Sequence, residues 1–172
     1  MTRLGFSHVG LVTRDMDATL AFYTGVLGLP AVRCDVLKVA EGGEIRHVFF
    51  DAGRGQLIAF MEAQGVETIP DDYDAGINKG LGLPSGMVHF AFEAGGVPEL
   101  EAKRAELLGK GVRVTKVVDH EWCRSIYFKD PNGIDLEFCC LTRELGPDDA
   151  RMQVRAEISV RRKPSSRRFE SE

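Results

Sequence analysis

The feature that most constrains the fold of this chain is an internal repeat. When His8 is placed on His89, the segments that begin SHVGLVT and VHFAFEA align without a gap as far as Gly28 and Gly109. Self-similarity of this kind is the sequence signature of a duplicated structural unit. We therefore expect two copies of one module, each contributing equivalent positions to the fold.

Each half predicts the same order of elements. SHVGLVT alternates hydrophobic and other residues like a strand, Asp15 is a candidate helix N-cap, and Gly28 is placed to end the helix. Segments 48–60 (VFFDAGRGQLIAF) and 126–138 (IYFKDPNGIDLEF) also align without a gap, and both predict strand, glycine-containing turn and strand. The prediction is an α+β fold. It consists of two βαβββ modules that form a curved, partly open, barrel-like sheet with flanking helices.

The chain of 172 residues is long enough for one domain with its own core. We expect this domain to cover residues 1–145, with module one at about 4–62 and module two at about 86–143. The connection between the modules is rich in Gly, Asp and Pro, and a connection of that length is often functional, for example as a lid. Residues 146–172 form a basic C-terminal tail.

Composition narrows the function classes. Hydrophobic residues make up 44% of the chain, but no apolar run is long enough to span a membrane, and the N-terminus lacks a secretory signal. The four cysteines lack metal-binding spacing and predict reduced thiols in a cytoplasmic protein. The tail from 151 onward carries seven basic and three acidic residues, but aromatic residues do not interleave with them and the body is acidic. We therefore expect no nucleic-acid partner and no membrane partner.

The repeat also indicates a metal site. His8 and His89 occupy equivalent places on the first strand of each half, whereas Glu137, on the last strand of the second half, matches Ala59 in the first. Alanine cannot bind metal, so His8, His89 and Glu137 remain, with open positions for water or substrate. Two imidazoles and one carboxylate suit Fe(II) and oxygen chemistry, although Mn, Ni, Zn and Co bind such ligands too. Glu62 is a poor fourth ligand, because strand alternation turns it to the opposite face from Ala59.

His120 and Tyr127 are candidate catalytic residues. A histidine near a metal can move a proton at neutral pH, and a tyrosine can donate a hydrogen bond to a substrate oxyanion. The position of Tyr127 depends on the turn that follows it. A loop at 130–134 places Tyr127 opposite Glu137 on one face, whereas a four-residue loop turns it away.

The motifs HVGLVTRDMDATLAFYTGVLGL, GMVHFAF and YFKDPNGIDLEF resemble the vicinal oxygen chelate superfamily over about residues 4–143. That superfamily holds glyoxalase I, extradiol ring-cleavage dioxygenases, fosfomycin- and bleomycin-resistance proteins, and methylmalonyl-CoA epimerase. The stretch from Val118 to Glu137 is similar to the extradiol dioxygenase signature: His, hydrophobic, Tyr, Asp-Pro-x-Gly, Glu.

The resemblance implies an Fe(II)-dependent extradiol-type dioxygenase that takes O2 and a catechol or another small molecule with vicinal oxygens. In it, His8, His89 and Glu137 hold iron, and His120 and Tyr127 assist. These folds commonly dimerise, so a homodimer is expected. Extradiol enzymes also have an acid–base histidine upstream of the second iron-binding histidine. Here the stretch DDYDAGINKG holds none, and Tyr73 or Asp74 stands there instead.

Two alternatives remain open. One is another metal enzyme of this fold, namely a glyoxalase-like lyase, an epimerase or a thiol-transferase resistance enzyme. The vacant corner at Ala59 weakens the glyoxalase version, which uses four ligands. The other is a metal-free protein that only binds a small molecule.

Overall fold

The computed structural model describes residues 5–152. The helices and strands form two successive groups along the chain. The first contains β1 (His8–Val12), α1 (Met16–Leu20), the π-helical turn η1 (Ala21–Val26), β2 (Ala31–Lys38), β3 (Glu44–Asp51) and β4 (Leu57–Gln64). The second contains α2 (Ile77–Gly80), β5 (Phe90–Glu93), α3 (Val97–Gly109), β6 (Val118–Asp119), β7 (Cys123–Lys129) and β8 (Asp135–Leu141).

The strands form two sheets with the same internal order. Sheet A runs β1-β4-β3-β2 and sheet B runs β5-β8-β7-β6. In each sheet the first strand pairs parallel with the last, and the remaining pairs are antiparallel. The predicted α+β class with two βαβββ modules is therefore confirmed. Within residues 5–152 the two sheets stay separate and no barrel closes.

The strand register reproduces the sequence repeat residue by residue. Phe49 pairs with Ala59 in sheet A, and Tyr127 pairs with Glu137 in sheet B. These pairs are the equivalents that the ungapped alignment of 48–60 with 126–138 predicts. The loop after β7 therefore covers residues 130–134, the alternative in which Tyr127 and Glu137 share a face.

The first helix begins and ends where the sequence predicts. The carboxylate of Asp15 accepts a hydrogen bond from the backbone N–H of Ala18 at 2.8 Å, which satisfies an otherwise unpaired donor of the first turn. The helical stretch continues as η1 to Val26, and Gly28 follows with a φ of 77°. A positive φ favours glycine, so Gly28 allows the chain to turn into β2.

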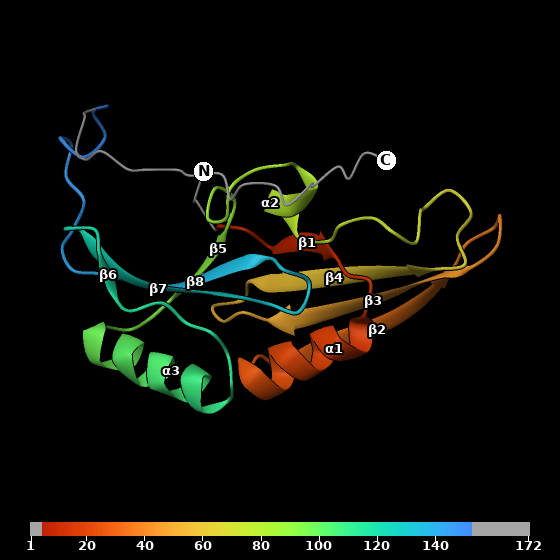
Figure 1. Ribbon diagram of the computed structural model, residues 1–172, viewed down its shortest axis with the longest axis horizontal. Helices are drawn as coiled ribbons and strands as arrows, with labels where there is room; N and C mark the ends of the chain where they lie inside the picture. The colour runs from red at the N-terminus through yellow and green to blue at the C-terminus, as the bar shows by residue number, and fades with distance from the viewer. Residues whose placement is uncertain (1–4, 153–172) are drawn as a thin grey trace, which may run out of the picture.

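Both sheets have one face against helices and one face away from them. Figure 1 shows α1 and α3 on the same side of the two sheets, whereas α2 and its flanking loops lie on the other side. We call the side away from α1 and α3 the open face. On β4, Phe60 and Glu62 point to the helix side, where the Glu62 carboxylate accepts from Met16 N–H at 3.0 Å. Glu62 is thus turned away from the open face, as predicted.

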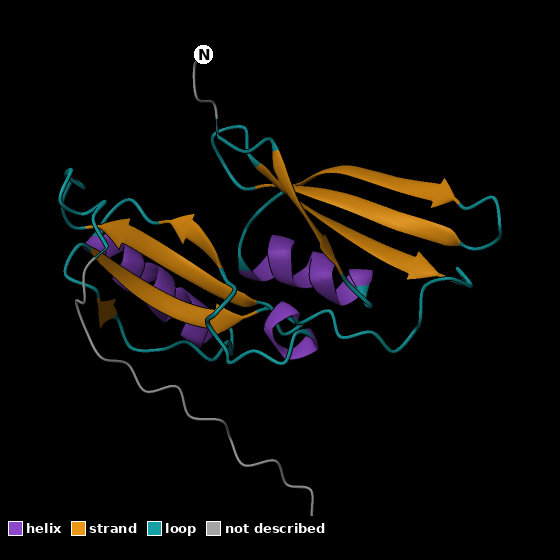
Figure 2. Cartoon of the chain, turned by 90° about the horizontal axis from the view of Figure 1, so that it is seen from above, coloured by secondary structure: helices purple, strands orange, loops and turns teal. Residues whose placement is uncertain are grey.

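A polar contact joins the modules side by side. Figure 2 shows the two sheets next to each other with their helices adjacent. Asn132, in the loop between β7 and β8, accepts from the Thr13 hydroxyl at 2.7 Å and donates to the Thr19 hydroxyl at 3.2 Å. Nearby, the Tyr23 hydroxyl donates to the Asp130 carboxylate at 3.3 Å. Burial raises the pKa of Tyr23, and also raises that of Asp130.

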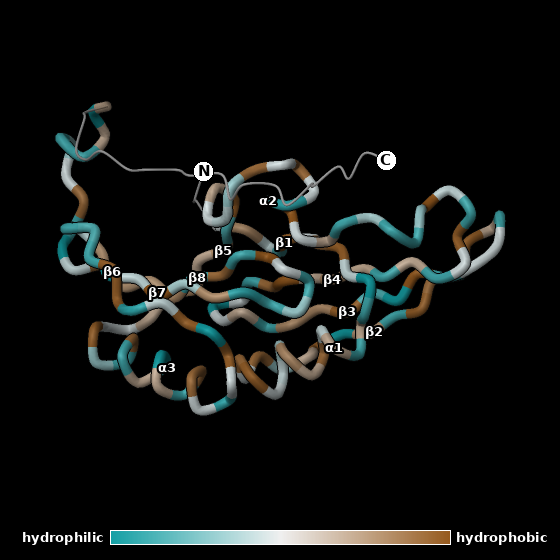
Figure 3. The backbone as a smooth tube through the Cα atoms, in the orientation of Figure 1, coloured by the Kyte–Doolittle hydropathy of each residue, from teal (hydrophilic) through white to brown (hydrophobic). Residues whose placement is uncertain are grey.

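Strand β2 is an outer strand of sheet A. Figure 3 shows that it carries both hydrophobic and hydrophilic residues along its length. Among residues 5–152, no helix has the length and apolar character needed to cross a bilayer. From residue 153 onward, the predicted basic tail lies outside the described residues. The division of the chain into a domain at 1–145 and a tail at 146–172 stays a prediction.

Candidate functional site

His89 and Glu137 form the centre of the candidate site. Glu137 lies on β8 between Ala91 of β5 and Tyr127 of β7, and only 5% of its surface is exposed. The Nε2 atom of His89, one residue before β5, is 3.0 Å from Oε2 of this carboxylate. A buried carboxylate needs a partner, and here the partner is an exposed imidazole that can also turn to a ligand.

The other nitrogen of the same ring is also held. Nδ1 of His89 is 2.9 Å from the carbonyl oxygen of Gly86. Because a carbonyl only accepts, this hydrogen bond requires the hydrogen on Nδ1. Nε2 then faces the Glu137 carboxylate, which is also an acceptor, and two acceptors at this spacing suit a cation between them. A histidine that donates from one nitrogen to a carbonyl and offers the other to a metal is a common arrangement around bound metal ions. The donor set therefore fits a divalent metal.

His120 and Tyr127 meet beside this pair. Nε2 of His120 is 2.9 Å from the Tyr127 hydroxyl oxygen, and the Tyr127 ring packs edge to face against His89 with ring centroids 6.2 Å apart. Burial, supported by the charge of Glu137, raises the pKa of Tyr127. The phenol therefore stays protonated at neutral pH and can donate a hydrogen bond. The structure thus brings four of the predicted site residues together: His89, Glu137, His120 and Tyr127.

His8 lies on the corresponding strand of module one. Its ring packs edge to face on Phe49 with centroids 5.7 Å apart, which matches the contact of His89 with Tyr127. Its Nδ1 is 3.0 Å from the hydroxyl of Ser7, and Ala59, the equivalent of Glu137, is 1% exposed. Module one therefore repeats the ring contact of module two, with Phe49 in the place of Tyr127 and Ala59 in the place of Glu137.

His8 does not join His89 and Glu137 within one chain. Across residues 5–152, no group of three or more His, Cys, Asp or Glu side chains is close enough to hold a metal ion. Of the three predicted ligands, His89 and Glu137 lie together in the single chain, and His8 lies apart from them.

Asp135 is a buried, multiply hydrogen-bonded residue next to the site that the sequence prediction did not include. It lies on β8, two residues before Glu137, and is 8% exposed. Its carboxylate accepts from Lys129 Nζ and the Ser85 hydroxyl at 2.6 Å each, from Asn78 at 2.7 Å and from Gly86 N–H at 3.2 Å. Burial alone would raise the pKa of Asp135, but these donors outweigh it and lower the pKa. The repeat held a signal for it, because the equivalent residue in module one is the apolar Leu57.

The connection between the modules is tied down by these contacts. Asn78 is 5% exposed, and its amide both donates to the Val88 carbonyl at 2.7 Å and accepts from the Val88 N–H at 2.8 Å. Lys79 pairs with Asp74 at 2.5 Å, and the Tyr73 hydroxyl donates to the Thr13 carbonyl at 2.7 Å. The side chains of Tyr73, Asn78 and Lys79 thus contact other parts of the same chain.

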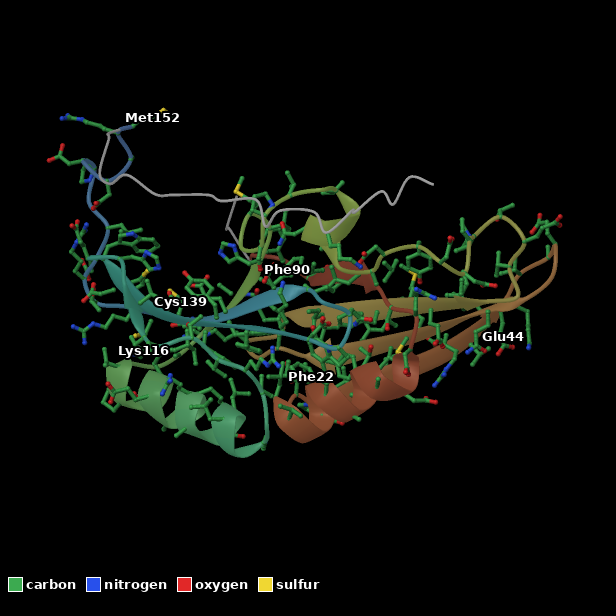
Figure 4. The ribbon with its side chains drawn as sticks, viewed as in Figure 1. Phe22, Glu44, Phe90, Lys116, Cys139 and Met152 are labelled. Atoms are coloured by element: carbon green, nitrogen blue, oxygen red, sulfur yellow. The ribbon has the colours of Figure 1, made fainter. Side chains whose placement is uncertain are left out.

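A cleft of about 740 Å³ lies between the modules, next to His89. Phe6, Val9 and Ile58 line its module-one side. Phe90, which Figure 4 labels near the middle of the molecule, lines its module-two side. The cleft is thus large enough for a small organic molecule beside the site.

The chain is similar to known proteins in both sequence and fold. The sequence model described as "Glyoxalase/Bleomycin resistance protein/Dioxygenase superfamily" matches residues 5–138. No curated protein sequence matches the chain. Several solved structures have the same fold.

Three of these structures illustrate the range. Integron cassette protein HFX_CASS4, from the mobile metagenome of Halifax Harbour Sewage Outfall, is 28% identical and has a TM-score of 0.53, over 80% of this chain and 98% of its own. The fosfomycin resistance protein FosX from Listeria monocytogenes is 21% identical (TM-score 0.57; 83% and 96% covered). TnmS3, an antibiotic binding protein from Streptomyces sp. CB03234, is 17% identical (TM-score 0.56; 83% and 99% covered).

Proposed function

Because the chain belongs to the glyoxalase/bleomycin resistance protein/dioxygenase superfamily, we propose that it is a divalent-metal enzyme acting on a small molecule with adjacent oxygen atoms. Its activity, in this proposal, is that of an Fe(II)-dependent extradiol-type dioxygenase. The observation that carries this choice is the 2.9 Å contact between His120 and the Tyr127 hydroxyl beside the His89–Glu137 pair. A lyase or a simple binding protein has no evident need for that second pair.

In this proposal His8, His89 and Glu137 hold the metal. When bound, the metal supplies a Lewis acid for the adjacent oxygens of the substrate and, as iron, reactivity toward O2. Tyr127 donates a hydrogen bond from its hydroxyl to a substrate oxyanion, which its raised pKa allows it to do at neutral pH. His120 accepts or returns a proton at Nε2, the nitrogen that faces Tyr127. The cleft beside His89 receives the rest of the substrate.

A second copy of the chain supplies His8 to each site in this proposal. The ligands His89 and Glu137 meet in one chain, whereas His8 lies on the open face of the other module. That face also carries the exposed apolar side chains of Val12 and Met61, which a second copy would cover. In a twofold dimer, each of the two sites then takes His8 from one protomer and the other two ligands from its partner.

Mixing two inactive variants tests this arrangement. His8→Ala and His89→Ala are each expected to lose high-affinity Co²⁺ binding. After the two are unfolded together and refolded, a mixed dimer regains one intact site, so about a quarter of the sites should return. Refolding each variant alone is the control. Recovery at the level of the separate variants would contradict a site shared between protomers.

The dioxygenase activity needs its own experiment. The protein is loaded with Fe(II) under anaerobic conditions, offered a panel of catechols and followed by O2 consumption and by the absorbance of ring-cleavage products. We expect O2 uptake with at least one catechol, absent in Glu137→Gln. Full iron loading without O2 uptake on any substrate would contradict the dioxygenase proposal but not the proposed metal site.

One observation favours a second function. Only two of the three ligands meet within the described part of a single chain, so a metal-free protein that binds a small molecule in the cleft is the competing proposal. The antibiotic-binding TnmS3 shares the fold. Purified protein without metal, and with ligand binding unaffected by His89→Ala, would favour this function. Bound Mn, Ni, Zn or Co instead of iron would favour a lyase, an epimerase or a thiol transferase such as a fosfomycin resistance enzyme.

A further inference from the structure

We propose that Asp135 is a positioning residue that sets the orientation of the His89 ring through the backbone of Gly86. The inference rests on the proposed role of His89 as a metal ligand. Its first support is a chain of two hydrogen bonds. The Asp135 carboxylate accepts from the N–H of Gly86 at 3.2 Å, and the carbonyl of Gly86 accepts from Nδ1 of His89 at 2.9 Å.

Asp135 is fixed strongly enough to act in this way. Three side chains donate to its buried carboxylate in addition to Gly86: Lys129 and Ser85 at 2.6 Å, and Asn78 at 2.7 Å. Hydrogen bonds to an ionised acceptor are the stronger kind, and a buried carboxylate keeps its partners because each vacated site would be costly. The carboxylate therefore holds the loop that contains Gly86 against the start of β8.

The backbone next to His89 is held from the same place. Asn78, one of the donors to Asp135, also pairs with both the N–H and the carbonyl of Val88. The position and the ring direction of His89 thus depend on one buried cluster. Strand β8 supplies both ends of this arrangement. Glu137 meets Nε2 directly, and Asp135, on the same face of the strand, fixes the partner of Nδ1.

Module one lacks the arrangement. The position of Asp135 is occupied by Leu57, which the register places at the start of β4 just as Asp135 starts β8. Nδ1 of His8 instead faces the exposed Ser7 hydroxyl of the neighbouring residue at 3.0 Å. A hydroxyl can donate or accept, so it does not select one ring nitrogen. His89 is therefore preset for its ligand, whereas His8 is left to adjust when the two halves of the site meet.

The Asp135→Asn variant tests the proposal in the metal-free protein. With four histidines in the chain, the ring ¹⁵N signals can be assigned by single His→Gln replacements. When the ring carries a single hydrogen, the Gly86 carbonyl at Nδ1 and the Glu137 carboxylate at Nε2 compete for it, and we expect the wild type to hold it on Nδ1 in a larger fraction than Asp135→Asn does. In Asp135→Asn, the population should move toward hydrogen on Nε2, where the Glu137 carboxylate remains as acceptor. Affinity for Co²⁺ alone should fall about 10- to 100-fold.

Asp51→Asn is the matched control. The Asp51 carboxylate also accepts from a glycine N–H, that of Gly53 at 2.7 Å, but it has no histidine beyond it. This variant should change neither the ring signals of His89 nor Co²⁺ affinity. If Asp135→Asn does not fold, Ser85→Ala, which removes one donor to the same carboxylate, should give a smaller change in the same direction.

Unchanged His89 signals in a folded Asp135→Asn protein would overturn the proposal. That failure is distinct from failure of the proposed function. If the wild type does not bind Co²⁺ although Asp135→Asn shifts its His89 ring signals, then the metal site is wrong and the positioning stands. If the wild type binds Co²⁺ and Asp135→Asn binds it equally well with the same ring signals, then only the positioning is wrong.

Discussion

The imidazole of His120 and the hydroxyl of Tyr127 lie 2.9 Å apart, the histidine from the turn before β7 and the tyrosine from the middle of that strand. The turn at His120 is closed by hydrogen bonds of Asp119 and Cys123, and Glu121 within it has a φ of 71°. The chain thus brings two groups with exchangeable protons together next to the buried carboxylate of Glu137. Their closeness gives the first prediction.

Tyr127→Phe should lower turnover with little effect on metal binding. The ring remains to pack against His89, but the hydroxyl that would stabilise a substrate oxyanion is lost. The loss of one such donor costs about 10²- to 10³-fold in rate. Initial rates and Co²⁺ titrations of the same preparation measure the two effects. Thr24→Ala is the control, because it removes an exposed hydroxyl that donates to the Leu20 carbonyl in the first helical stretch, away from the site. Equal rates for Tyr127→Phe and wild type would remove Tyr127 from the mechanism.

Glu137→Gln should abolish tight metal binding while the protein stays folded. The amide keeps the shape of the side chain but lacks the negative charge that a divalent ion needs, and it still reaches Nε2 of His89. Metal content after dialysis and circular dichroism of the same sample give the result. Glu93→Gln, an exposed carboxylate paired with Arg54, serves as the comparison. Metal retained at the wild-type level in Glu137→Gln would require another ligand set.

The contribution of Asp130 to the free energy of unfolding should increase on mild acidification. Burial raises its pKa in the folded protein above the unfolded value of about 3.9, so the folded state takes up this proton first. The contribution of Asp130 to the free energy of unfolding therefore increases as the pH falls through the raised pKa toward the unfolded value. Asp130→Asn lacks this gain.

Urea unfolding at pH 7 and at mildly acidic pH measures this effect. The stability of the wild type minus that of Asp130→Asn should rise toward acid. A difference that shrinks toward acid would mean that the hydrogen bonds from Asn132 and Ile134 outweigh burial, and that the pKa is lowered.

Asn132→Ala should loosen the contact between the modules. It removes the two hydrogen bonds that Thr13 and Thr19 make with module two. Both hydroxyls keep partners within module one, so each lost hydrogen bond costs about 0.5–1.5 kcal/mol. Denaturant midpoints report the loss, and Thr68→Ala, at an exposed position of the connection, should leave the midpoint unchanged. Independent unfolding of two modules in Asn132→Ala would show that this contact also couples them. Full wild-type stability would mean that the apolar contacts suffice.

The repeat in the sequence predicts much of the structure because strand register is local. The length of the turn after Lys129 fixes which residue of β8 faces Tyr127, and the same turn in module one places Phe49 opposite Ala59. Alternation then fixes the faces, so Glu62 points to the helix and Glu137 to the open face. These relations need only neighbouring residues and the period of a strand.

Other relations were beyond the sequence. Asp135 meets Asn78 across 57 residues of chain, and Asn132 meets Thr13 across 119. Nothing in the local pattern of DDYDAGINKGLGLPSG indicates that Asn78 is buried and holds the backbone before His89. Such contacts depend on how the connection and the two modules pack, which is set by many weak interactions at once.

The sequence by itself determined the two-module fold, the pairing of the last two strands in each module and the face on which Glu62 and Glu137 lie, because a duplicated pattern with a period of two residues leaves little freedom within a hairpin. The tertiary structure alone decided which of these residues meet. It brings His89 to Glu137 and His120 to Tyr127, while His8 stays with the other module. The physical reason is that strand periodicity does not encode the parallel pairing of β5 with β8, the turn that carries His120, or, for His8, the docking of the modules through Asn132 and long-range packing.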